Sequence, residues 1–431
     1  MPRIAFIGAG SVEFTKNLLG DILSFPELAD CQIALHDIDE ERLGVAEQMA
    51  RYTARALGAR PTIEVCPDRR RALDGADHAI NMIQVGGHPA TLLDFRIPAA
   101  YGLRQTIGDT LGIGGIFRAL RTIPVMLEIG ADMAELCPGA WLLNYTNPMA
   151  MLCWATYAGS SQQRIVGLCH SVQHTTAQLA ELAGVPFADV SFLGAGVNHQ
   201  AFILRFQRGG EDLYPLLDQA IERDPGLRRR VRMEIYRRFG YFPTESSEHS
   251  AEYLPWFMRS DEAIEHFRIP VDEYIARSEE NLELYEQMRR SLDAGEEIEI
   301  ERSQEYASLI IHSMLTGRER VIYGNVRNDG LITNLPAGAC VEVPCLVDRN
   351  GVQPTIVGDL PPQLAALNRT FLNVCELTVR AALEGSREHV HQAALLDPAA
   401  SAALSPDVIA TIVDELIDAH GDALPEGVRR S

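Results

Sequence analysis

The first forty residues carry the sequence feature that most restricts the fold of this chain. Residues 3–7 form an apolar, β-branched run that predicts a buried strand, and they lead into the small-residue turn Gly8-Ala9-Gly10-Ser11. Apolar residues at helical spacing follow, and residues 31–35 predict a second strand that ends just before Asp37. A strand, a glycine turn, a helix, a strand and an acid in this order predict a dinucleotide-binding βαβ unit.

Each part of this unit has a chemical purpose. Gly8 and Gly10 let the backbone approach a pyrophosphate, and the helix that starts near Ser11 offers N–H donors and a partial positive charge. Asp37 follows Gly10 by 27 residues and could accept from ribose hydroxyls. Glu13 stands where a third glycine is expected, so a purely structural turn is the alternative.

The rest of the chain predicts an α/β fold in two parts. Residues 1–193 alternate strands and helices, which predicts an NAD-binding, Rossmann-type doubly wound sheet; residues 194–431 predict an α+β substrate-binding and catalytic lobe. The combination resembles the lactate and malate dehydrogenases. Val85 and Gly86 follow a predicted strand at residues 76–83, so we expect them beside the cofactor.

The other predicted elements alternate in the same way. Strands are predicted at 63–65, 141–145, 164–168, 190–198, 201–206, 323–334, 340–346 and 352–357. Helices are predicted at 39–57, 69–73, 116–137, 272–300, 363–384 and 407–419, and the glycine-rich segment 103–115 is expected to be irregular.

Composition restricts the partners and the compartment. The 431 residues carry a formal charge of −21, which argues against nucleic acid as a partner. No apolar run approaches membrane-spanning length and no secretory signal is evident, so a cytoplasmic protein without a membrane partner is expected. The eight cysteines form no Cys-x-x-Cys pair, so most are expected to be small core residues.

Cys169 and His199 are the candidates for a metal site. A thiolate and an imidazole suit a transition ion such as Mn²⁺, Fe²⁺ or Zn²⁺, and two protein ligands leave positions open for water and substrate. The alternative is a buried core cysteine and a structural histidine. Both residues lie among five stretches that concentrate reactive side chains, at 108–110, 144–148, 169–171, 196–199 and 245–249.

These stretches resemble glycoside hydrolase family 4, the NAD- and metal-dependent glycosidases, and in particular its bacterial α-galactosidases (melibiases). The Cys-His-Ser-Val window at 169–172 is similar to the version associated with α-galactosidases. The matching segments cover nearly the whole chain, at 6–11, 109–112, 143–151, 167–173, 244–249 and 323–330.

The resemblance implies a mechanism in which NAD⁺ takes a hydride from C3 of the sugar. A metal, Mn²⁺ or another divalent transition ion held by Cys169 and His199, would polarise the oxygens at C2 and C3. Loss of the C2 proton, elimination of the aglycone, addition of water and return of the hydride would complete the hydrolysis. Glycosidases of this type are exceptions to the two-carboxylate rule.

The resemblance also implies roles for individual residues. Asp109 matches the general acid of related α-glycosidases; the alternative is an acid that only caps a turn. The base remains open among Glu248, His249 and Tyr253, and His249 could instead hold the sugar or a water. The positions that match sugar-binding residues of the family are Asn147, His170 and Asn198.

The sequence thus predicts an α-galactosidase that acts on small, unphosphorylated α-galactosides. An α-glucosidase or broad α-hexosidase of the same family is the nearest alternative. A hydroxy-acid or sugar dehydrogenase is the alternative from another class, because it would share the fold. The resemblance further implies a homodimer or homotetramer.

Overall fold

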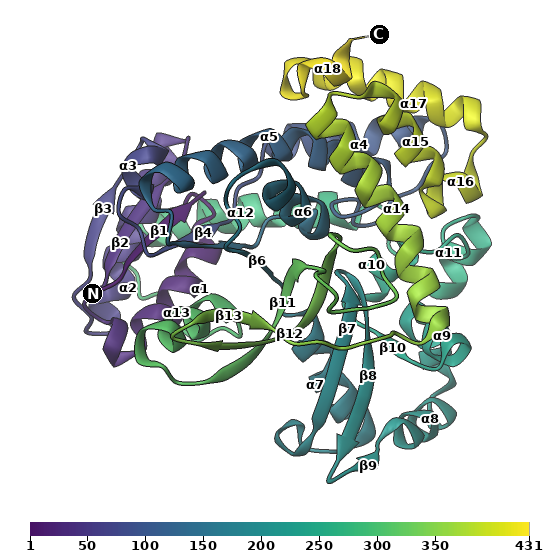
Figure 1. Cartoon of the computed structure of the whole chain (residues 1–431), viewed down its shortest axis with the longest axis horizontal. Coiled ribbons are helices and arrows are strands. Elements are labelled where there is room, and N and C mark those ends of the chain that lie inside the picture. The colour runs from purple at the N-terminus through teal and green to yellow at the C-terminus, as the bar shows by residue number, and fades with distance from the viewer. Residues whose placement is uncertain (431) are drawn as a thin grey trace.

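One sheet of 13 strands runs through the computed structural model, which describes residues 1–430 (Figure 1). Its main path follows the order β10-β8-β7-β12-β11-β6-β5-β4-β1-β2-β3. The six strands from β3 to β6 are parallel, and the remainder pair antiparallel. The order 3-2-1-4-5-6 is that of a Rossmann sheet, so the predicted fold class is confirmed.

The parallel half alternates strands and helices. Its strands are β1 (Arg3–Ile7), β2 (Gln32–His36), β3 (Thr62–Val65), β4 (His78–Asn81), β5 (Trp141–Asn144) and β6 (Ile165–Leu168). Its helices are α1 (Val12–Leu23), α2 (Glu40–Ala56), α3 (Arg69–Leu73), α4 (Gly87–Ala100), α5 (Gly112–Leu136), α6 (Met149–Gly159) and α7 (Ser171–Ala183).

The second half combines antiparallel strands with helices. Its strands are β7 (Ser191–Val197), β8 (Gln200–Arg208), β9 (Glu211–Asp212), β10 (Phe242–Pro243), β11 (Arg320–Arg327), β12 (Cys340–Asp348) and β13 (Gly351–Pro354). Its helices are α8 (Tyr214–Arg223), α9 (Val231–Phe239), α10 (Ser247–Glu252), α11 (Asp261–Phe267), α12 (Glu273–Ala294), α13 (Tyr306–Thr316), α14 (Pro362–Glu384), α15 (Arg387–Leu396), α16 (Pro398–Ala403), α17 (Pro406–His420) and α18 (Glu426–Arg429).

The two halves are joined through the sheet itself. β11 pairs antiparallel with β6, so a strand from late in the chain continues the nucleotide-binding sheet. The predicted boundary between residues 193 and 194 falls inside β7. The two-domain division stays a prediction, because the sheet is continuous across both parts.

The glycine-rich segment departs from its prediction at its end. Residues 103–111 are irregular as expected, but α5 begins at Gly112, four residues before the predicted start at Ile116. The first turn of α5 packs on the loop before it, and a Cβ on Gly114 would lie 2.7 Å from the carbonyl oxygen of Gly108. Glycine is therefore used here for close packing within a helix. The sequence pattern predicts no helix at the positions of α4, α7–α11, α13, α15, α16 and α18.

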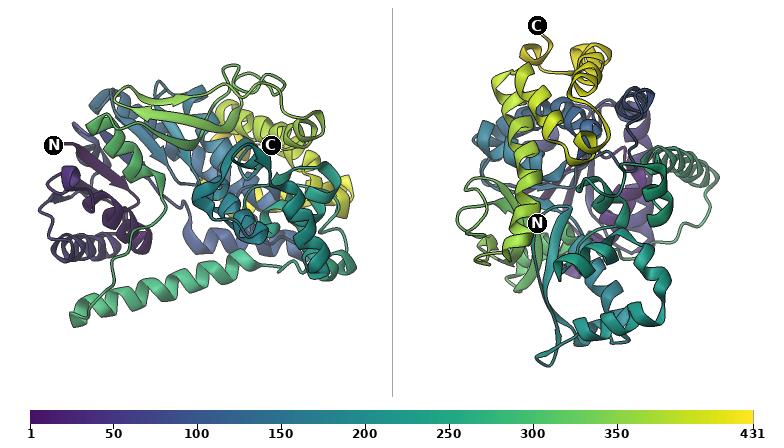
Figure 2. Two further views of the ribbon diagram at one scale, coloured as in Figure 1. Left: turned by 90° about the horizontal axis from the view of Figure 1, so that it is seen from below. Right: turned by 90° about the vertical axis from the view of Figure 1, so that its right-hand side faces the viewer.

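Helix α12 lies along the side of the molecule where the parallel strands end (Figure 2). It is slightly shorter than the predicted helix at 272–300, and none of its residues is fully buried. Its acidic residues face solvent as the charge pattern predicts. Within residues 1–430, no helix has both the length and the apolar composition needed to cross a membrane.

A buried ion pair holds together the helices that flank the segment 103–111. Arg121 of α5 donates to both carboxylate oxygens of Asp94 on α4, at 2.9 and 2.7 Å. His420 of α17 lies 2.8 Å from the same carboxylate, and all three side chains are buried. This cluster determines how α4 and α5 present the segment between them.

Replacing Asp94 by asparagine should destabilise the fold strongly. The guanidinium of Arg121 would remain buried without a counter-charge, which costs about 3–5 kcal/mol of unfolding free energy. Urea denaturation measures the loss. Arg380→Ala, which removes an exposed ion pair with Glu376, is the control and should cost at most about 1 kcal/mol. Equal losses of unfolding free energy in the two variants would show that the Asp94–Arg121 pair is not a strong stabilising contact.

The carboxylate of Glu252 fixes the same segment from the other half of the chain. It accepts the backbone N–H groups of Thr106, Ile107 and Gly108 at 2.8 to 3.2 Å. Burial raises the pKa of Glu252 to about 7, although these N–H groups and His249 act in the opposite direction. A six-residue helix, α10, therefore holds a loop that lies about 140 residues earlier in the sequence.

Glu252 should make stability depend on pH. Its folded-state pKa of about 7 exceeds the ordinary value of 4.5, so its contribution is full below about pH 4.5 and is lost as the pH rises through 7. Between about pH 4.5 and 7, the unfolding free energy of Glu252→Gln should therefore rise relative to that of the parent protein by about 3 kcal/mol. Urea midpoints at several pH values measure the difference. The exposed Glu376→Gln is the matched control, and a flat difference for Glu252→Gln would refute the effect.

Candidate functional site

The predicted site residues gather at the carboxyl ends of the parallel strands. The turn at residues 8–11 follows β1, Val85 and Gly86 follow β4, Asn147 follows β5, and Cys169 follows β6. β1 and β4 are neighbours in the sheet. The chain continues from β1 to β2 in one direction across the sheet and from β4 to β5 in the opposite direction. A crevice at such a switch point is where open α/β sheets bind ligands.

The backbone of the nucleotide turn, residues 8–11, lies close to neighbouring segments of the protein, as its glycines predict. Gly8 has φ +90°, and its N–H donates to the carbonyl of His36 at 2.9 Å. A Cβ on Gly10 would lie 2.6 Å from a carboxylate oxygen of Asp37. Ser11 precedes the first turn of α1, where free N–H groups face an incoming anion.

Asp37 lies at the end of β2 beside this turn. One of its carboxylate oxygens accepts the N–H of Gly10 at 2.7 Å and the other accepts the N–H of Asp39 at 3.0 Å. These bonds hold the carboxylate at the edge of the crevice, where the predicted ribose would lie. Gly86 has φ +81° and precedes α4, so the β4 loop contributes a second helix N-terminus.

Cys169 and His199 come together as the metal prediction requires, and Glu245 joins them. The ligand atoms of these three residues lie within 4.8 Å of one another. Burial and the charges of Glu245 and Glu342 raise the pKa of the Cys169 thiol. A cation would reverse this effect, because a bound metal stabilises the thiolate.

The imidazole of His199 is oriented by a chain of hydrogen bonds. The hydroxyl of Thr110 donates to Asp109 at 2.8 Å, so its oxygen accepts from Nδ1 of His199 at 3.2 Å. The hydrogen on Nδ1 leaves Nε2 as the free lone pair, which is the arrangement typical of metal-binding histidines. Burial, together with the neighbouring His249, lowers the pKa of His199 to about 4, so the imidazole is neutral.

His249 lies between the metal cluster and Asp109. Its Nδ1 is 3.2 Å from Glu245 and its Nε2 is 3.8 Å from Asp109. Burial acts to lower the pKa of His249, but the two carboxylates outweigh it and raise the pKa to about 9. His249 is therefore a cation at neutral pH. Its ring contacts that of His199 edge to face, with ring centroids 4.6 Å apart.

Asp109 is ionised in this environment. Burial acts to raise its pKa, but the charges of Arg118 and His249 outweigh burial and hold the pKa below the usual range. The amide of Asn147 donates to its other oxygen at 3.0 Å, and the Oδ1 atom of that amide is buried without a partner. The mobile proton of the Asp109–His249 pair thus lies on His249.

The other predicted sugar-binding residues differ in exposure. His170 is half exposed and its Nδ1 lies 3.1 Å from Glu305, which raises the pKa of His170. Asn198 is fully buried and donates to Glu342 at 3.4 Å. Burial raises the pKa of Glu342 to about 8. Asn198 therefore lies in the buried wall beside His199.

The three candidate bases lie in different surroundings. Glu248 forms a 2.9 Å ion pair with Arg230, which draws its carboxylate away from Asp109 and Glu245. The hydroxyl of Tyr253 accepts the backbone N–H of His199 at 3.0 Å, within reach of the metal cluster. His249 is in the centre of the site, so the geometry favours His249 and Tyr253 over Glu248.

Sequence reasoning missed Glu245, Glu252 and Arg118. Glu245 has φ +67°, a left-handed conformation unusual for glutamate that turns its carboxylate toward Cys169. Its position four residues before His249 in a matched segment was the available signal. Arg118 lies inside α5 among apolar residues, where nothing in the spacing distinguishes a buried cation that acts on Asp109.

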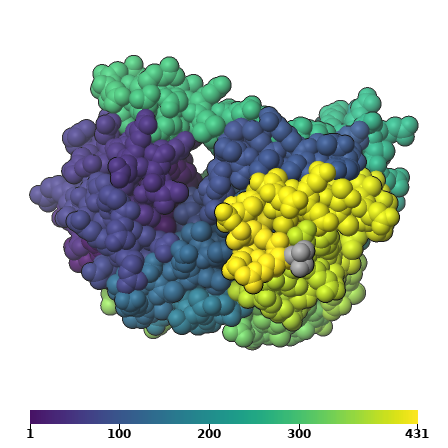
Figure 3. All heavy atoms as spheres, turned by 90° about the horizontal axis from the view of Figure 1, so that it is seen from above, coloured from purple at the N-terminus to yellow at the C-terminus, as the bar shows by residue number. Residues whose placement is uncertain are grey.

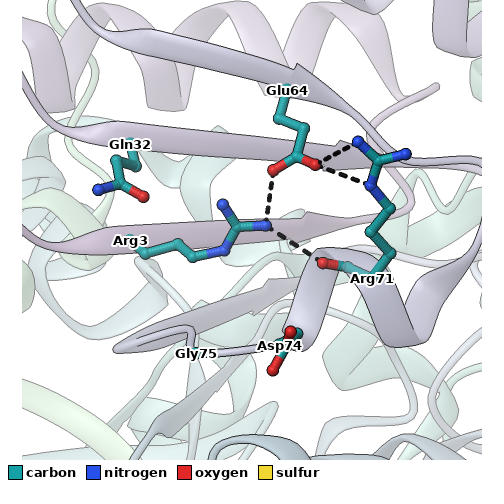
Figure 4. A pocket seen from close by; sticks show the side chains of 6 residues that line it. All are labelled: Arg3, Gln32, Glu64, Arg71, Asp74 and Gly75. Atoms are coloured by element: carbon teal, nitrogen blue, oxygen red, sulfur yellow. Dashed lines mark hydrogen bonds and ion pairs between the residues drawn. The ribbon is translucent and has the colours of Figure 1, made fainter.

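A separate polar pocket lies at the opposite edge of the sheet, near the amino ends of β1 and β2 (Figure 4). Glu64 pairs there with Arg3 at 2.9 Å and with Arg71 at 2.7 Å, so its charges are already neutralised within the protein. Because it is at the wrong end of the strands, this pocket is not part of the candidate site.

The sequence of the chain matches two family models. The model described as family 4 glycosyl hydrolase matches residues 3–185, and the model described as family 4 glycosyl hydrolase C-terminal domain matches residues 194–400. Together they cover most of the chain.

Three relatives align over nearly the full length. An alpha-galactosidase from Bacillus subtilis is 46% identical and covers 99% of this chain and 100% of its own length. An alpha-galactosidase from Rhizobium meliloti is 37% identical, with coverages of 98% and 89%. An alpha-glucosidase from Erwinia rhapontici is 31% identical, with coverages of 92% and 93%.

Solved structures share the fold. The Bacillus subtilis protein lplD has a TM-score of 0.88 at 26% identity, covering 96% of this chain and 99% of its own. A Thermotoga maritima 6-phospho-beta glucosidase, solved with manganese, NAD⁺ and glucose-6-phosphate, has a TM-score of 0.81 at 22% identity and coverages of 98% and 99%. Lactate dehydrogenase from Eimeria maxima has a TM-score of 0.56 at 18% identity and coverages of 89% and 95%, which confirms the predicted dehydrogenase-like fold.

The resemblance drawn from the sequence motifs is therefore confirmed: the chain belongs to glycosyl hydrolase family 4 and is a glycosidase.

Proposed function

We propose that this glycosidase is an NAD- and Mn²⁺-dependent α-galactosidase. The observation that carries the proposal is the cluster of Cys169, His199 and Glu245 beside Asp109, at the carboxyl edge of a nucleotide-binding sheet. An ordinary acid/base glycosidase needs neither a dinucleotide turn nor a thiolate ligand.

The residues fit both groups. At the start of α1, Gly8 and Gly10 let the turn pack closely against residues 82–83 and Asp37, and Asp37 is held where it can accept from a ribose. A neutral imidazole with free Nε2, a thiol and a carboxylate suit Mn²⁺ or another divalent transition ion. When bound, NAD⁺ supplies a hydride acceptor for C3 of the sugar and the metal supplies a Lewis acid at the C2 and C3 oxygens.

The chain's own residues handle the protons. His249 carries the proton and lies 3.8 Å from Asp109, so the pair can deliver a proton to the departing glycosidic oxygen through Asp109. Asn147 and Arg118 hold Asp109 in place: Asn147 donates to its carboxylate, and Nε of Arg118 donates to the carbonyl of Asn147 at 3.2 Å. The buried walls of the cluster exclude water around these groups.

Tyr253 is our preferred base for the C2 proton, with His249 as the alternative. Its hydroxyl accepts the N–H of His199 and therefore stays within the metal cluster. Burial raises the pKa of Tyr253, so it can act only where a neighbouring cation stabilises the phenolate. The ion pair of Glu248 with Arg230 argues against Glu248 in this role.

The proposed substrates are small, unphosphorylated α-galactosides. The Cys-His-Ser-Val segment at 169–172 and the names of the two most identical relatives above support this choice. An α-glucosidase remains the second candidate, supported by the Erwinia rhapontici relative. We further propose a homodimer or homotetramer, and a cytoplasmic location that would keep Cys169 reduced.

Nitrophenyl α-glycosides test the specificity directly. With NAD⁺ and Mn²⁺ present, we expect nitrophenol release to be fastest from the galacto substrate, because the two supporting relatives are named alpha-galactosidases. A clear preference for the gluco substrate would favour the α-glucosidase. Absorbance at 340 nm should show no continuous accumulation of NADH; accumulation without release of sugar would indicate a dehydrogenase.

Replacing Cys169 by serine should weaken Mn²⁺ binding at least about tenfold and abolish metal-dependent turnover, because a neutral hydroxyl is a poor substitute for a thiolate. Calorimetric titration with Mn²⁺ measures the loss, and NAD⁺ affinity should stay unchanged. Cys345→Ser, at a buried cysteine of β12 outside the cluster, is the matched control. Full metal affinity in Cys169→Ser would overturn the ligand assignment.

A substrate deuterated at C2 tests the deprotonation step. We expect slower turnover, or exchange of the label with solvent, since the C2–H bond breaks during the reaction. Mass spectrometry of recovered sugar and the initial rates of labelled and unlabelled substrate provide the measurements. A rate ratio of one together with complete retention of label would rule out this mechanism.

A further inference from the structure

Helix α12 lies across the mouth of the nucleotide crevice. At its N-terminal end, the N–H groups of Asp272 and Tyr274 donate to the carbonyls of Gln105 and Thr106, both at 2.9 Å. Beyond its C-terminal end, the backbone of Ile298 bonds to the hydroxyl of Tyr52 on α2. Figure 3 shows an opening between the purple N-terminal segments and the neighbouring blue segment, with green atoms along its upper edge.

One side chain of α12 is connected to the nucleotide turn through Arg42. Tyr285 packs its ring against the guanidinium of Arg42, whose Cζ lies 4.2 Å from the ring centroid. Nη1 of the same guanidinium donates to the carbonyl of Gly10 at 3.1 Å. The helix is thereby connected to the turn that is built to approach a pyrophosphate.

Two polar atoms on this side of the helix are buried and have no partner in the protein. One is the hydroxyl oxygen of Tyr285, and the other is Nδ1 of His88. His88 lies in the first turn of α4, and its Nε2 is 3.9 Å from Glu279 of α12. Buried tyrosine hydroxyls normally find a hydrogen-bond partner. Ribose hydroxyls and phosphate oxygens are the polar groups that a dinucleotide would bring to this place.

We propose that Tyr285 is a cofactor-binding residue that retains NAD in the crevice, a role that rests on the NAD dependence proposed above. Its hydroxyl bonds the adenosine ribose or the pyrophosphate, and its ring keeps Arg42 against the carbonyl of Gly10. The other contacts of α12 keep the helix across the crevice. The helix therefore limits exit of the dinucleotide as well as contributing to its affinity.

Retention is consistent with the chemistry. A dehydrogenase must release its reduced cofactor after each turnover, so a slow exit limits its rate. In a hydrolysis that takes a hydride from the sugar and later returns it, the cofactor ends each cycle unchanged. A cover that slows its release then has no effect on turnover.

The test is NAD⁺ binding to the full-length protein without substrate or metal. Calorimetry supplies Kd, and displacement in a stopped-flow instrument supplies the dissociation rate. Tyr285→Phe, which keeps the ring, should raise Kd about fivefold by loss of one hydrogen bond. Tyr285→Ala, which also removes the support of Arg42, should raise Kd and the dissociation rate more than tenfold. Gln287→Ala, two residues further along α12 and exposed, is the control and should stay within twofold.

Thermal unfolding separates binding from folding. Without NAD⁺, the Tm of Tyr285→Phe should equal that of the parent, while the rise in Tm on addition of NAD⁺ should be smaller. If the parent binds NAD⁺ and both Tyr285 variants bind and release it within twofold of the parent, the proposal is overturned and the proposed function stands. If the parent itself binds no NAD⁺, the proposed function fails instead.

Discussion

The hydroxyl of Thr110 is the contact on which the site depends. It donates to Asp109 and accepts from His199, so one oxygen atom links the predicted acid to a metal ligand. Because the hydroxyl has only one hydrogen, its direction determines which nitrogen of His199 keeps a proton. The lone pair of Nε2 is thereby left for a metal. The candidate acid and the candidate metal ligand are thus oriented by the same side chain.

Helix α10 makes this contact possible by holding both of its sides. Glu252 binds the N–H groups just before Asp109, and Tyr253 accepts the N–H of His199. His249 on the same helix supplies the positive charge between Glu245 and Asp109. Helix α10 and Tyr253, the residue that follows it, thus bring a loop of the Rossmann half and a β-turn of the second half to a fixed distance. The continuous sheet beneath them keeps both halves from moving apart.

The crevice combines features that pure dehydrogenases and pure glycosidases have separately. The nucleotide turn lies at the carboxyl end of β1 and the metal cluster at the end of β6, with β4 and β5 between them. Short loops on adjacent parallel strands bring the nucleotide turn and the candidate metal ligands to one edge of the sheet. In the function proposed above, a redox fold performs a net hydrolysis because the hydride is taken and returned at the same sugar carbon.

The sequence alone determined the local features and the family. The βαβ unit follows from strand and helix periodicity around a small-residue turn, and the reactive clusters follow from polar residues placed directly after apolar strands. Those patterns are short-range, so they can be recognised along the chain. They marked Cys169 and His199 as candidates for a metal, and the family resemblance added Asp109 as the candidate acid.

Only the tertiary structure decided which neighbours act on them. Glu245 turns toward Cys169 through a left-handed backbone, Glu248 turns away to Arg230, and Glu252 reaches a loop far earlier in the chain. Within the short segment 245–252, three acids face three different partners, and the periodicity of the sequence does not show which acid faces which partner. The position of α12 across the crevice is equally long-range, since its charged sequence predicts only an exposed helix. Contacts between residues distant in sequence depend on how the elements pack, which the order of residues does not show directly.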